Sequence, residues 1–293
     1  MLKLSQQYPL KRAFITGAAS GLGKELAKQL AQDGWKLGVC DISEERLTAT
    51  VDELKAYGHT VAMFVLDVGN DMAYKVVADT FLKQFGGVDL LINNAGVGEG
   101  SLFEAYTTEN WKWITGVNQM AAIYGCSFFL PAMLAQQAGY IINIASAAAF
   151  ANAPTMAPYN VTKAAVLSLS ETLYAETKHR GIKVSVVMPT FFRTNIDRFA
   201  RGGNEHKETA HKLLATSGIE ASEMAAAILC HAGRGKFYIL LPAKAKFLFL
   251  VKRLFPMLFL RFTAYIASNQ ESLNNKLQER YGKLSDKEKT IEE

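Results

Sequence analysis

The alternation of two kinds of segment constrains the fold more than any other feature of the sequence. Over the first 240 residues, short runs rich in β-branched residues alternate with longer stretches in which apolar residues recur at helical spacing. The strands that we expect are residues 12–16, 36–41, 60–66, 88–92, 140–145, 182–188 and 236–241. The helices that we expect are residues 21–33, 43–57, 71–85, 111–137, 159–180 and 222–231. This pattern predicts a doubly wound α/β fold, in which a parallel sheet of about seven strands is covered on both faces and binds ligands at its carboxyl edge.

The composition is that of an ordinary globular protein, because 49% of the 293 residues are hydrophobic and 20% are charged. The three cysteines include no CxxC pair and the five histidines show no metal-ligand spacing, so we expect neither a disulfide framework nor a metal site. Most of the net charge of +5 lies near the C-terminus, and the near-neutral remainder argues against nucleic-acid binding. The N-terminus is too polar for a secretory signal, which predicts a cytoplasmic protein.

Three glycines follow the first expected strand. Gly17, Gly21 and Gly23 lie in the segment TGAASGLG, directly before an expected helix. Glycines at such a turn let the backbone approach a phosphate closely, and the start of the helix offers N–H groups to a pyrophosphate. We therefore expect Ser20 and Leu22 to line a dinucleotide site together with the three glycines. The spacing is GxxxGxG rather than the commoner GxGxxG, and the alternative is a tight turn without a ligand.

The end of the second expected strand indicates which dinucleotide binds. Asp41 lies 18 residues after Gly23, where a carboxylate can accept hydrogen bonds from the adenosine ribose of NAD and would repel the 2′-phosphate of NADP. Ser20 and Ile42 stand where a basic partner for that phosphate is usual. We therefore predict NAD in preference to NADP. The alternative is that Asp41 only caps the turn at Ser43.

A serine, a tyrosine and a lysine follow the fifth expected strand in a pattern that suits proton transfer. Ser146 comes directly after the strand, and Tyr159 follows 13 residues later. Tyr159 and Lys163 are four residues apart, so they share one face of a helix. A free tyrosine has a pKa of about 10, and a neighbouring ammonium would lower that pKa. We therefore predict that Tyr159 is a general acid/base, the alternative being a chance pair on an exposed helix.

These segments resemble the short-chain dehydrogenase/reductase family, in the family's order and at similar spacing, over about residues 12–195. The segments that carry the resemblance are residues 16–23, Asp67, Val68, Asn93, Asn94, Gly96, Asn118, Ser146, Tyr159, Lys163, Pro189 and Thr194. The resemblance implies a single Rossmann-type domain of seven parallel strands and a catalytic tetrad of Asn118, Ser146, Tyr159 and Lys163.

The resemblance also implies a role for each member of the tetrad. Tyr159 exchanges the proton with the substrate oxygen, and Ser146 donates a hydrogen bond to that oxygen. Lys163 holds the nicotinamide ribose and lowers the pKa of Tyr159. Asn118 orders a water molecule that links Lys163 to solvent as a proton relay.

Further residues line the cofactor cleft by the same resemblance. They are Asp67 and Val68 beside the adenine, Asn94 and Gly96 along the cleft, and Pro189 and Thr194 at the carboxamide of the nicotinamide. Asn93 instead ties adjacent strands together. The family commonly has glycine after the proline that corresponds to Pro189, whereas this chain has Thr190, which weakens the assignment of Thr194.

Small and aromatic residues surround the predicted reaction centre. Residues 147–151, directly after Ser146, read AAAFA, and the segment after the sixth expected strand contains Phe191, Phe192, Ile196 and Phe199. Small residues leave room beside the serine, and aromatic residues supply an apolar wall. Each of them could instead pack in the core. Together they favour a bulky apolar alcohol or ketone as the substrate.

The alternation ends near residue 242, so we expect a catalytic domain over residues 1–242 and an extension over residues 243–293. Residues 247–266 read FLFLVKRLFPMLFLRFTAYI, and residues 244–270 contain five basic side chains and no acidic one. The charges within the run and the break at Pro256 argue against a transmembrane helix. Such a run must be covered by its own domain, by another subunit or by lipid. The basic flanks favour peripheral contact with the cytoplasmic face of a membrane.

Two other functions stay open on the sequence alone. One is an NADP-dependent carbonyl reductase, which Asp41 disfavours. The other is a non-catalytic nucleotide-binding or membrane-associated protein, which the complete tetrad disfavours. We also expect the chain to form a homo-oligomer.

Overall fold

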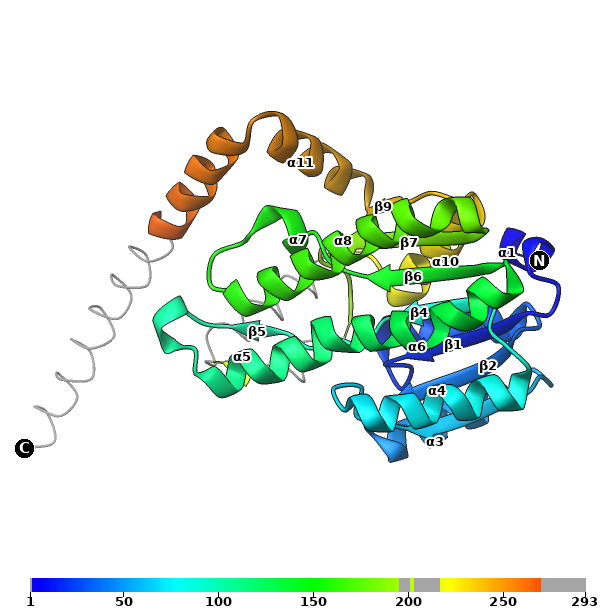
Figure 1. Ribbon diagram of the computed structural model, residues 1–293. Coiled ribbons are helices and arrows are strands. Elements are labelled where there is room, and N and C mark those ends of the chain that lie inside the picture. The colour runs from blue at the N-terminus through cyan, green and yellow to red at the C-terminus, as the bar shows by residue number, and fades with distance from the viewer. Residues whose placement is uncertain (1, 195–200, 203–216, 270–293) are drawn as a thin grey trace, which may run out of the picture. The chain divides into compact units, whose positions relative to one another are not determined.

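A seven-stranded parallel sheet forms the centre of the computed structural model, which describes residues 2–194, 201–202 and 217–269 (Figure 1). In spatial order the strands are β3 (Val61–Val65), β2 (Lys36–Asp41), β1 (Arg12–Thr16), β4 (Leu90–Asn93), β6 (Gly139–Ile144), β7 (Ile182–Pro189) and β9 (Tyr238–Leu241). The direction of winding reverses between β1 and β4, as in doubly wound sheets. The predicted fold class is confirmed, and each predicted strand end lies within two residues of the observed one.

Helices cover both faces of the sheet (Figure 1). One face carries α1 (Lys3–Gln7), α2 (Gly21–Gln32), α3 (Glu44–Lys55) and α10 (Ala221–Gly233). The other face carries α4 (Asp71–Phe85), α6 (Ala121–Gln136) and α8 (Ala157–Thr177). Successive residues of a strand point to opposite faces, so Ile15 packs in the first layer and Phe14 in the second. Both side chains are fully buried, which fixes the register of β1 between its neighbours.

The helix predicted over residues 111–137 is not uniform. α5 (Thr108–Thr115) begins earlier, at a capping box formed by Thr107 and Asn110. A π-helical turn, η2 (Gly116–Met120), then separates α5 from α6. A π turn inserts an extra residue into the helix and is frequent at functional sites. The turn carries Asn118, one of the predicted tetrad residues.

Several short elements have no counterpart among the predicted ones. They are α1, β5 (Glu99–Gly100), η1 (Phe103–Ala105), α7 (Ala148–Ala151), η3 (Lys178–Arg180) and β8 (Arg201–Gly202). β5 and β8 pair in parallel as a separate two-stranded ribbon. Elements of two to five residues show no hydrophobic period, because a period needs several turns or alternations to be visible.

The chain divides into two compact units, Met1–Phe247 and Leu248–Glu293. α11 (Ala243–Leu254) begins directly after β9 and therefore at the carboxyl edge of the sheet. A second helical segment follows over residues 256–269. The predicted division into a catalytic domain and an extension after residue 242 stays a prediction. The boundary between the two units lies within α11, a few residues later.

Candidate active site

The glycine loop after β1 is held in a shape that only glycine allows at two positions. Gly17 has a φ of +66°, and a Cβ there would lie 2.8 Å from Cα of Ala95. A Cβ on Gly23 would overlap the carbonyl oxygen of Gly17. The loop can therefore lie close to both α2 and the segment after β4 only if these side chains are absent. The sequence predicts that these glycines contact a phosphate. The structure adds that the close packing of the backbone requires glycine at both positions.

The first turn of α2 suits an anionic ligand. Gly21 and Leu22 begin the helix, and Ser20 occupies the N-cap position without a capping hydrogen bond from its side chain within the described chain. The N–H groups of a first turn have no partner inside their own helix, and the helix dipole makes this end positive. The loop therefore offers the backbone donors that a pyrophosphate needs, and the assignment of these residues to the cofactor stays a prediction.

Asn94 braces the glycine loop. Its Nδ2 donates to the carbonyl oxygens of Thr16 at 2.9 Å and Gly17 at 3.1 Å. The Thr16 hydroxyl oxygen in turn accepts the backbone N–H groups of Asn94 and Ala95, both at 3.0 Å. These bonds tie the end of β1 to the end of β4, so both amide hydrogens of Asn94 are used in shaping the cleft. Asn93 behaves as predicted, donating across the sheet to Asn143 at 2.8 Å.

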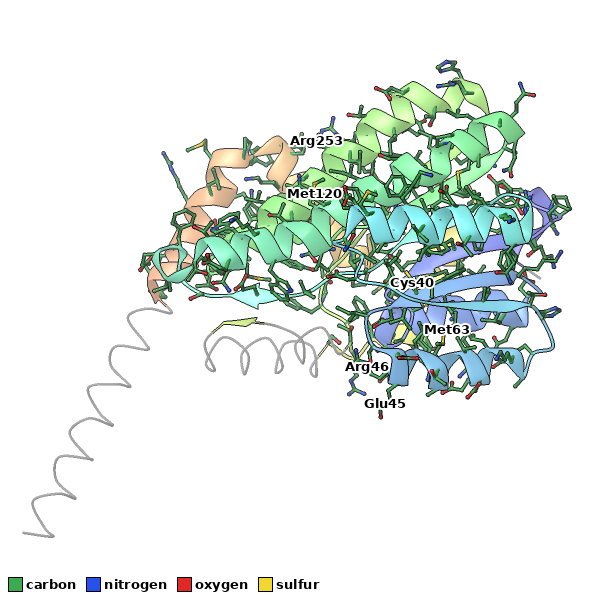
Figure 2. All side chains as sticks on the ribbon, turned by 60° about the horizontal axis from the view of Figure 1, so that its bottom comes forward. Cys40, Glu45, Arg46, Met63, Met120 and Arg253 are labelled. Atoms are coloured by element: carbon green, nitrogen blue, oxygen red, sulfur yellow. The ribbon has the colours of Figure 1, made fainter. Side chains whose placement is uncertain are left out.

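Asp41 ends β2 with its carboxylate fixed by two backbone groups. One oxygen accepts the N–H of Ala19 and the other the N–H of Ser43, both at 3.1 Å. Asp41 thus caps the turn at Ser43, and its bond to Ala19 also places it against the glycine loop. Arg46, in the first turn of α3 (Figure 2), approaches Asp41 at 3.8 Å. The sequence shows no basic residue at the positions next to Asp41, whereas the structure places Arg46 beside its carboxylate.

The turn after β3 lies next to Asp41. The N–H of Leu66 donates to the carbonyl oxygen of Asp41 at 2.9 Å. Asp67 follows with an exposed side chain that accepts the N–H of Gly69 at 2.9 Å, and Val68 is buried. The structure therefore brings the residues predicted to flank the adenine to the same edge of the sheet as Asp41.

Ser146, Tyr159 and Lys163 meet beyond the carboxyl ends of β6 and β7. Ser146 lies two residues after the end of β6, and its hydroxyl oxygen accepts the N–H of Ala148 at 3.1 Å. Tyr159 and Lys163 lie one turn apart on α8, both buried, with Nζ of Lys163 5.6 Å from the centre of the Tyr159 ring. Nζ also donates to the carbonyl oxygen of Ile144 at 3.0 Å. The structure thus brings together the three residues that the sequence separates by up to 17 positions.

Burial dominates the electrostatics of this pair. It raises the pKa of Tyr159 above 10.0, although the hydrogen bond with Ser146 lowers that pKa in part. Burial also lowers the pKa of Lys163 from 10.5 to about 8. The expected lowering of the Tyr159 pKa by Lys163 is therefore not seen in the protein alone. Burial removes water from the phenolate, and the hydrogen bond with Ser146 offsets only part of that loss.

Asn118 is clamped to the segment after β4. Its side-chain oxygen accepts the N–H of Val97 at 2.8 Å, and its Nδ2 donates to the carbonyl oxygen of Val97 at 3.0 Å. A Cβ on Gly96 would lie 3.3 Å from Nζ of Lys163 and 3.4 Å from the side-chain oxygen of Asn118. Gly96 therefore lets Asn118 and Lys163 approach each other across the backbone. The water relay implied by the resemblance stays a prediction.

An apolar cluster surrounds the hydroxyl-bearing ring. Tyr159 packs with Ile114 and Ala148, and these three contact Val97, Trp113 and Met156. The aromatic segment after β7 contributes less than predicted. Phe192 is buried in the core with residues of α2 and α10, whereas Phe191 is exposed. Phe192 therefore follows the alternative of core packing rather than the predicted apolar wall, while Ile196 and Phe199 lie outside the described residues.

The end of β7 positions the last predicted cofactor residues. The carbonyl oxygen of Pro189 accepts the N–H of Ala147 at 2.9 Å, which places Pro189 beside Ser146. The N–H of Thr190 donates to Leu241 at 2.9 Å, and the buried Thr190 hydroxyl has no hydrogen-bond partner among the described residues. Thr194 is half-buried at the end of the described segment.

Comparisons with known proteins agree with this arrangement. The family model for short chain dehydrogenases matches residues 11–204. The chain belongs to this family. It is a family of oxidoreductases that act on CH–OH groups with a nicotinamide cofactor. An uncharacterized oxidoreductase of Bacillus subtilis is 37% identical over 182 residues, which is 61% of this chain and 67% of the relative. The match thus spans about two thirds of that relative.

Two solved structures share the fold over most of the chain. A short chain dehydrogenase/reductase from Burkholderia phymatum in complex with NAD has a TM-score of 0.75 and 34% identity, covering 78% of this chain and 88% of the other. An alcohol dehydrogenase from Thermococcus sibiricus complexed with 5-hydroxy-NADP has a TM-score of 0.67 and 26% identity, covering 76% and 90%. The family therefore supports a nicotinamide cofactor, while both forms of it occur among the similar structures.

Several residues of the site were not predicted from the sequence. Arg46 could have been found, because the first turn of a helix lies beside the end of the preceding strand in an α/β unit. Val97, Ile114, Trp113 and Met156 had no such signal. They come from three separate segments, and only the packing of α5 against α8 brings them to Tyr159.

Proposed function

We propose that this protein is an NAD-dependent oxidoreductase that transfers a hydride between nicotinamide and a lipophilic secondary alcohol or ketone. The observation that carries the proposal is the buried Tyr159 ring, which is hydrogen-bonded to Ser146, lies 5.6 Å from Nζ of Lys163 and is walled by apolar side chains. A polar reaction centre inside an apolar cluster suits a substrate with one oxygen on a hydrocarbon frame.

The residues of the carboxyl edge fit a dinucleotide along the row of strand ends. The first turn of α2 with Gly17, Ser20, Gly21, Leu22 and Gly23 would hold the pyrophosphate. Asp41, Asp67 and Val68 would hold the adenosine, and Asn94, Gly96, Lys163, Pro189 and Thr194 would line the nicotinamide half. When bound, the cofactor supplies the site that accepts or donates the hydride.

Tyr159 holds or releases a proton at its hydroxyl oxygen. Burial raises its pKa, so Tyr159 is a neutral phenol at neutral pH and is ready to donate a proton to a carbonyl oxygen. In the direction of alcohol oxidation Tyr159 must first lose this proton, and the rate should therefore rise with pH. The oxygen of Ser146 already accepts the N–H of Ala148, and its O–H, which bonds to Tyr159 in the protein alone, would turn to the substrate oxygen when a substrate binds.

Lys163 and Asn118 position the reaction centre. The bond from Lys163 to Ile144 anchors its Nζ beneath Tyr159. Asn118 fixes Val97, which belongs to the apolar wall, through two hydrogen bonds. The position of Asn118 in a π turn beside Gly96 supports a role in proton relay from Lys163.

NAD is proposed in preference to NADP because Asp41 presents a fixed carboxylate at the end of β2. The Arg46 side chain at 3.8 Å offsets part of that charge. The discrimination against NADP should therefore be moderate, and the related structures with NAD and with an NADP derivative are compatible with this expectation.

We further propose a cytoplasmic homo-oligomer with peripheral contact to the membrane. Among the described residues, one helical stretch is long and apolar enough to span a membrane, Thr108–Gln136, and less than half of it is buried. Its α6 part packs on the sheet, so a second subunit is the better cover for its open side. Tyr124 and Phe128 stack there at 6.0 Å and are half-buried.

The experiment that tests the reaction is Tyr159→Phe, which removes the exchangeable proton and keeps the shape. We expect NAD binding by calorimetry to be unchanged and turnover of apolar alcohols to fall by at least about 100-fold. Tyr174→Phe, on the same helix far from the reaction centre, is the matched control and should retain activity. Wild-type turnover in Tyr159→Phe would reject the mechanism, and a wild-type preference for NADP would reject the cofactor assignment.

A further inference from the structure

We propose that α11 and the helix over residues 256–269 form a surface that binds an anionic lipid bilayer. The inference rests on the peripheral location proposed above but not on the reaction. Of the 21 exposed large hydrophobic side chains in the described chain, ten lie within residues 247–266. Scattered exposed side chains are normal, whereas a dense group marks a site of interaction.

The apolar side chains of α11 form one stripe. Phe247, Leu250 and Leu254 are three and seven positions apart, so they lie on the same face of the helix, and each is more than half exposed. Ala245 lies on the opposite face and is fully buried. Lys246 and Arg253 precede Phe247 and Leu254 and therefore flank the stripe. Helices that lie in the interface of a membrane have this arrangement, with an apolar face bordered by basic residues.

The second helical segment also carries exposed apolar side chains, although they are not confined to one face. Leu258, Phe262 and Tyr265 are spaced at four and seven positions and are exposed. Phe259 is buried, and Nζ of Lys252 lies 5.3 Å from the centre of its ring. This contact leaves the neighbouring stripe open. The stripe therefore adds exposed apolar area to that of α11.

The charge of the surface selects the partner. Residues 244–270 contain five Lys or Arg side chains and no acidic side chain. Arg253 and Arg261 are exposed beside Leu254 and Phe262. Long basic side chains can reach lipid phosphates while their neighbours enter the acyl boundary. Pairing with the same surface of a second copy would instead oppose two groups of five positive charges.

The helices fit a position on the bilayer and not across it. Neither belongs to the stretch that, among the described residues, is long and apolar enough to span a membrane. Lys252, Arg253 and Arg261 would have to enter the hydrocarbon in a spanning arrangement, at high cost. In an interfacial arrangement they stay at the level of the headgroups.

The test is co-sedimentation of the full chain with two kinds of vesicle, phosphatidylcholine alone and phosphatidylcholine with phosphatidylglycerol. We expect binding to the anionic vesicles at low salt and its loss at high salt, since screening shortens the reach of the headgroup charge to about 3 Å at 1 M. Arg253→Gln with Arg261→Gln should weaken anionic binding by about fivefold for each charge removed.

Leu254→Glu with Leu258→Glu should abolish binding to both kinds of vesicle. The matched control is Met72→Glu with Val76→Glu, two equally exposed apolar residues of α4, which should bind as the wild type does. Failure of the wild type to bind anionic vesicles would overturn the inference, as would equal losses in both double variants. If the glutamates instead dissociate an oligomer in solution, the surface is a subunit interface and the inference is wrong.

Turnover measured on the same samples separates this inference from the proposed reaction. Vesicle binding without turnover of any alcohol would contradict the reaction and support the lipid surface. Turnover without vesicle binding would support the reaction and contradict the lipid surface.

Discussion

The buried charged side chains at the two edges of the central sheet differ in the number of partners that they have. At the amino edge, Arg12 and Asp89 form an ion pair at 2.8 Å, and both side chains are almost completely buried. The guanidinium also donates to Gly86 at 2.6 Å and to Gln136 at 3.0 Å. At the carboxyl edge, Lys163 is buried to the same degree and donates to one backbone carbonyl, that of Ile144. None of the ion pairs found in the described chain includes Lys163.

This difference suggests that the charges at the amino edge stabilise the fold, whereas the charge at the carboxyl edge serves the reaction. A buried charge with a full set of partners resists change, because removing one partner leaves the other without compensation. A buried ammonium without a carboxylate is destabilised, which is why the pKa of Lys163 falls to about 8. Such a group is typical of sites that use their charge on a ligand. The comparison predicts that mutations at the two edges change stability in opposite directions.

The largest effect is expected for Arg12→Met at the amino edge. The substitution leaves the Asp89 carboxylate buried without its ion-pair partner, and we expect a loss of about 3–5 kcal/mol in the free energy of unfolding. Urea denaturation measures it. Adding Asp89→Asn to Arg12→Met removes the stranded charge and should recover a large part of the loss. If the single variant is as stable as the wild type, the amino edge does not have the role given to it here.

Lys163→Met tests whether a substitution at the carboxyl edge increases stability. The variant loses the hydrogen bond to Ile144 but also the cost of burying an ammonium, and we expect it to be more stable than the wild type at pH 7 by about 2 kcal/mol. Turnover should be lost at the same time. Lys178→Met, an exposed lysine near the end of the same helix, is the control and should change neither property. If Lys163→Met is less stable than the wild type, the ammonium must be stabilised by interactions other than its hydrogen bond to Ile144, and the prediction is wrong.

The smallest effect is expected at the end of β2. Arg46→Ala removes a partly exposed charge from beside Asp41, and interaction across solvent at 3.8 Å is weak. We expect the ratio of kcat/KM with NAD to that with NADP to rise by about two- to fivefold. Arg46→Lys keeps the charge and should leave the ratio close to that of the wild type. A fall in the ratio for Arg46→Ala would contradict the role assigned to Arg46.

Most of the fold and the motif residues of the site could be predicted from the sequence. The strands were visible because apolar runs such as residues 139–144 are buried on both faces of a parallel sheet. Ser146, Tyr159 and Lys163 were found because each has a fixed place relative to a strand or a helix. The structure then brought them together as the topology requires.

The rest depended on contacts that no local pattern records. The π turn at Asn118 separates α5 from α6, and an apolar helical stretch looks the same in the sequence with or without the extra residue. Phe192 and Phe191 are adjacent aromatic residues, yet one is in the core and the other is exposed. The pKa of Tyr159 depends on burial, which raises it, and on the hydrogen bond with Ser146, which lowers it, and both exist only in the folded chain.

The pH dependence of stability in wild type and Lys163→Met tests the contrast between the edges most directly. The folded pKa of Lys163 is about 8 and its unfolded value 10.5. The unfolded chain therefore holds more of this proton between these values, so the wild type gains stability over that range as pH rises. We expect the advantage of Lys163→Met at pH 7 to shrink steadily between pH 8 and 10.5. An advantage that does not change with pH, or none at pH 7, would contradict the claim that this edge holds a charge without a partner.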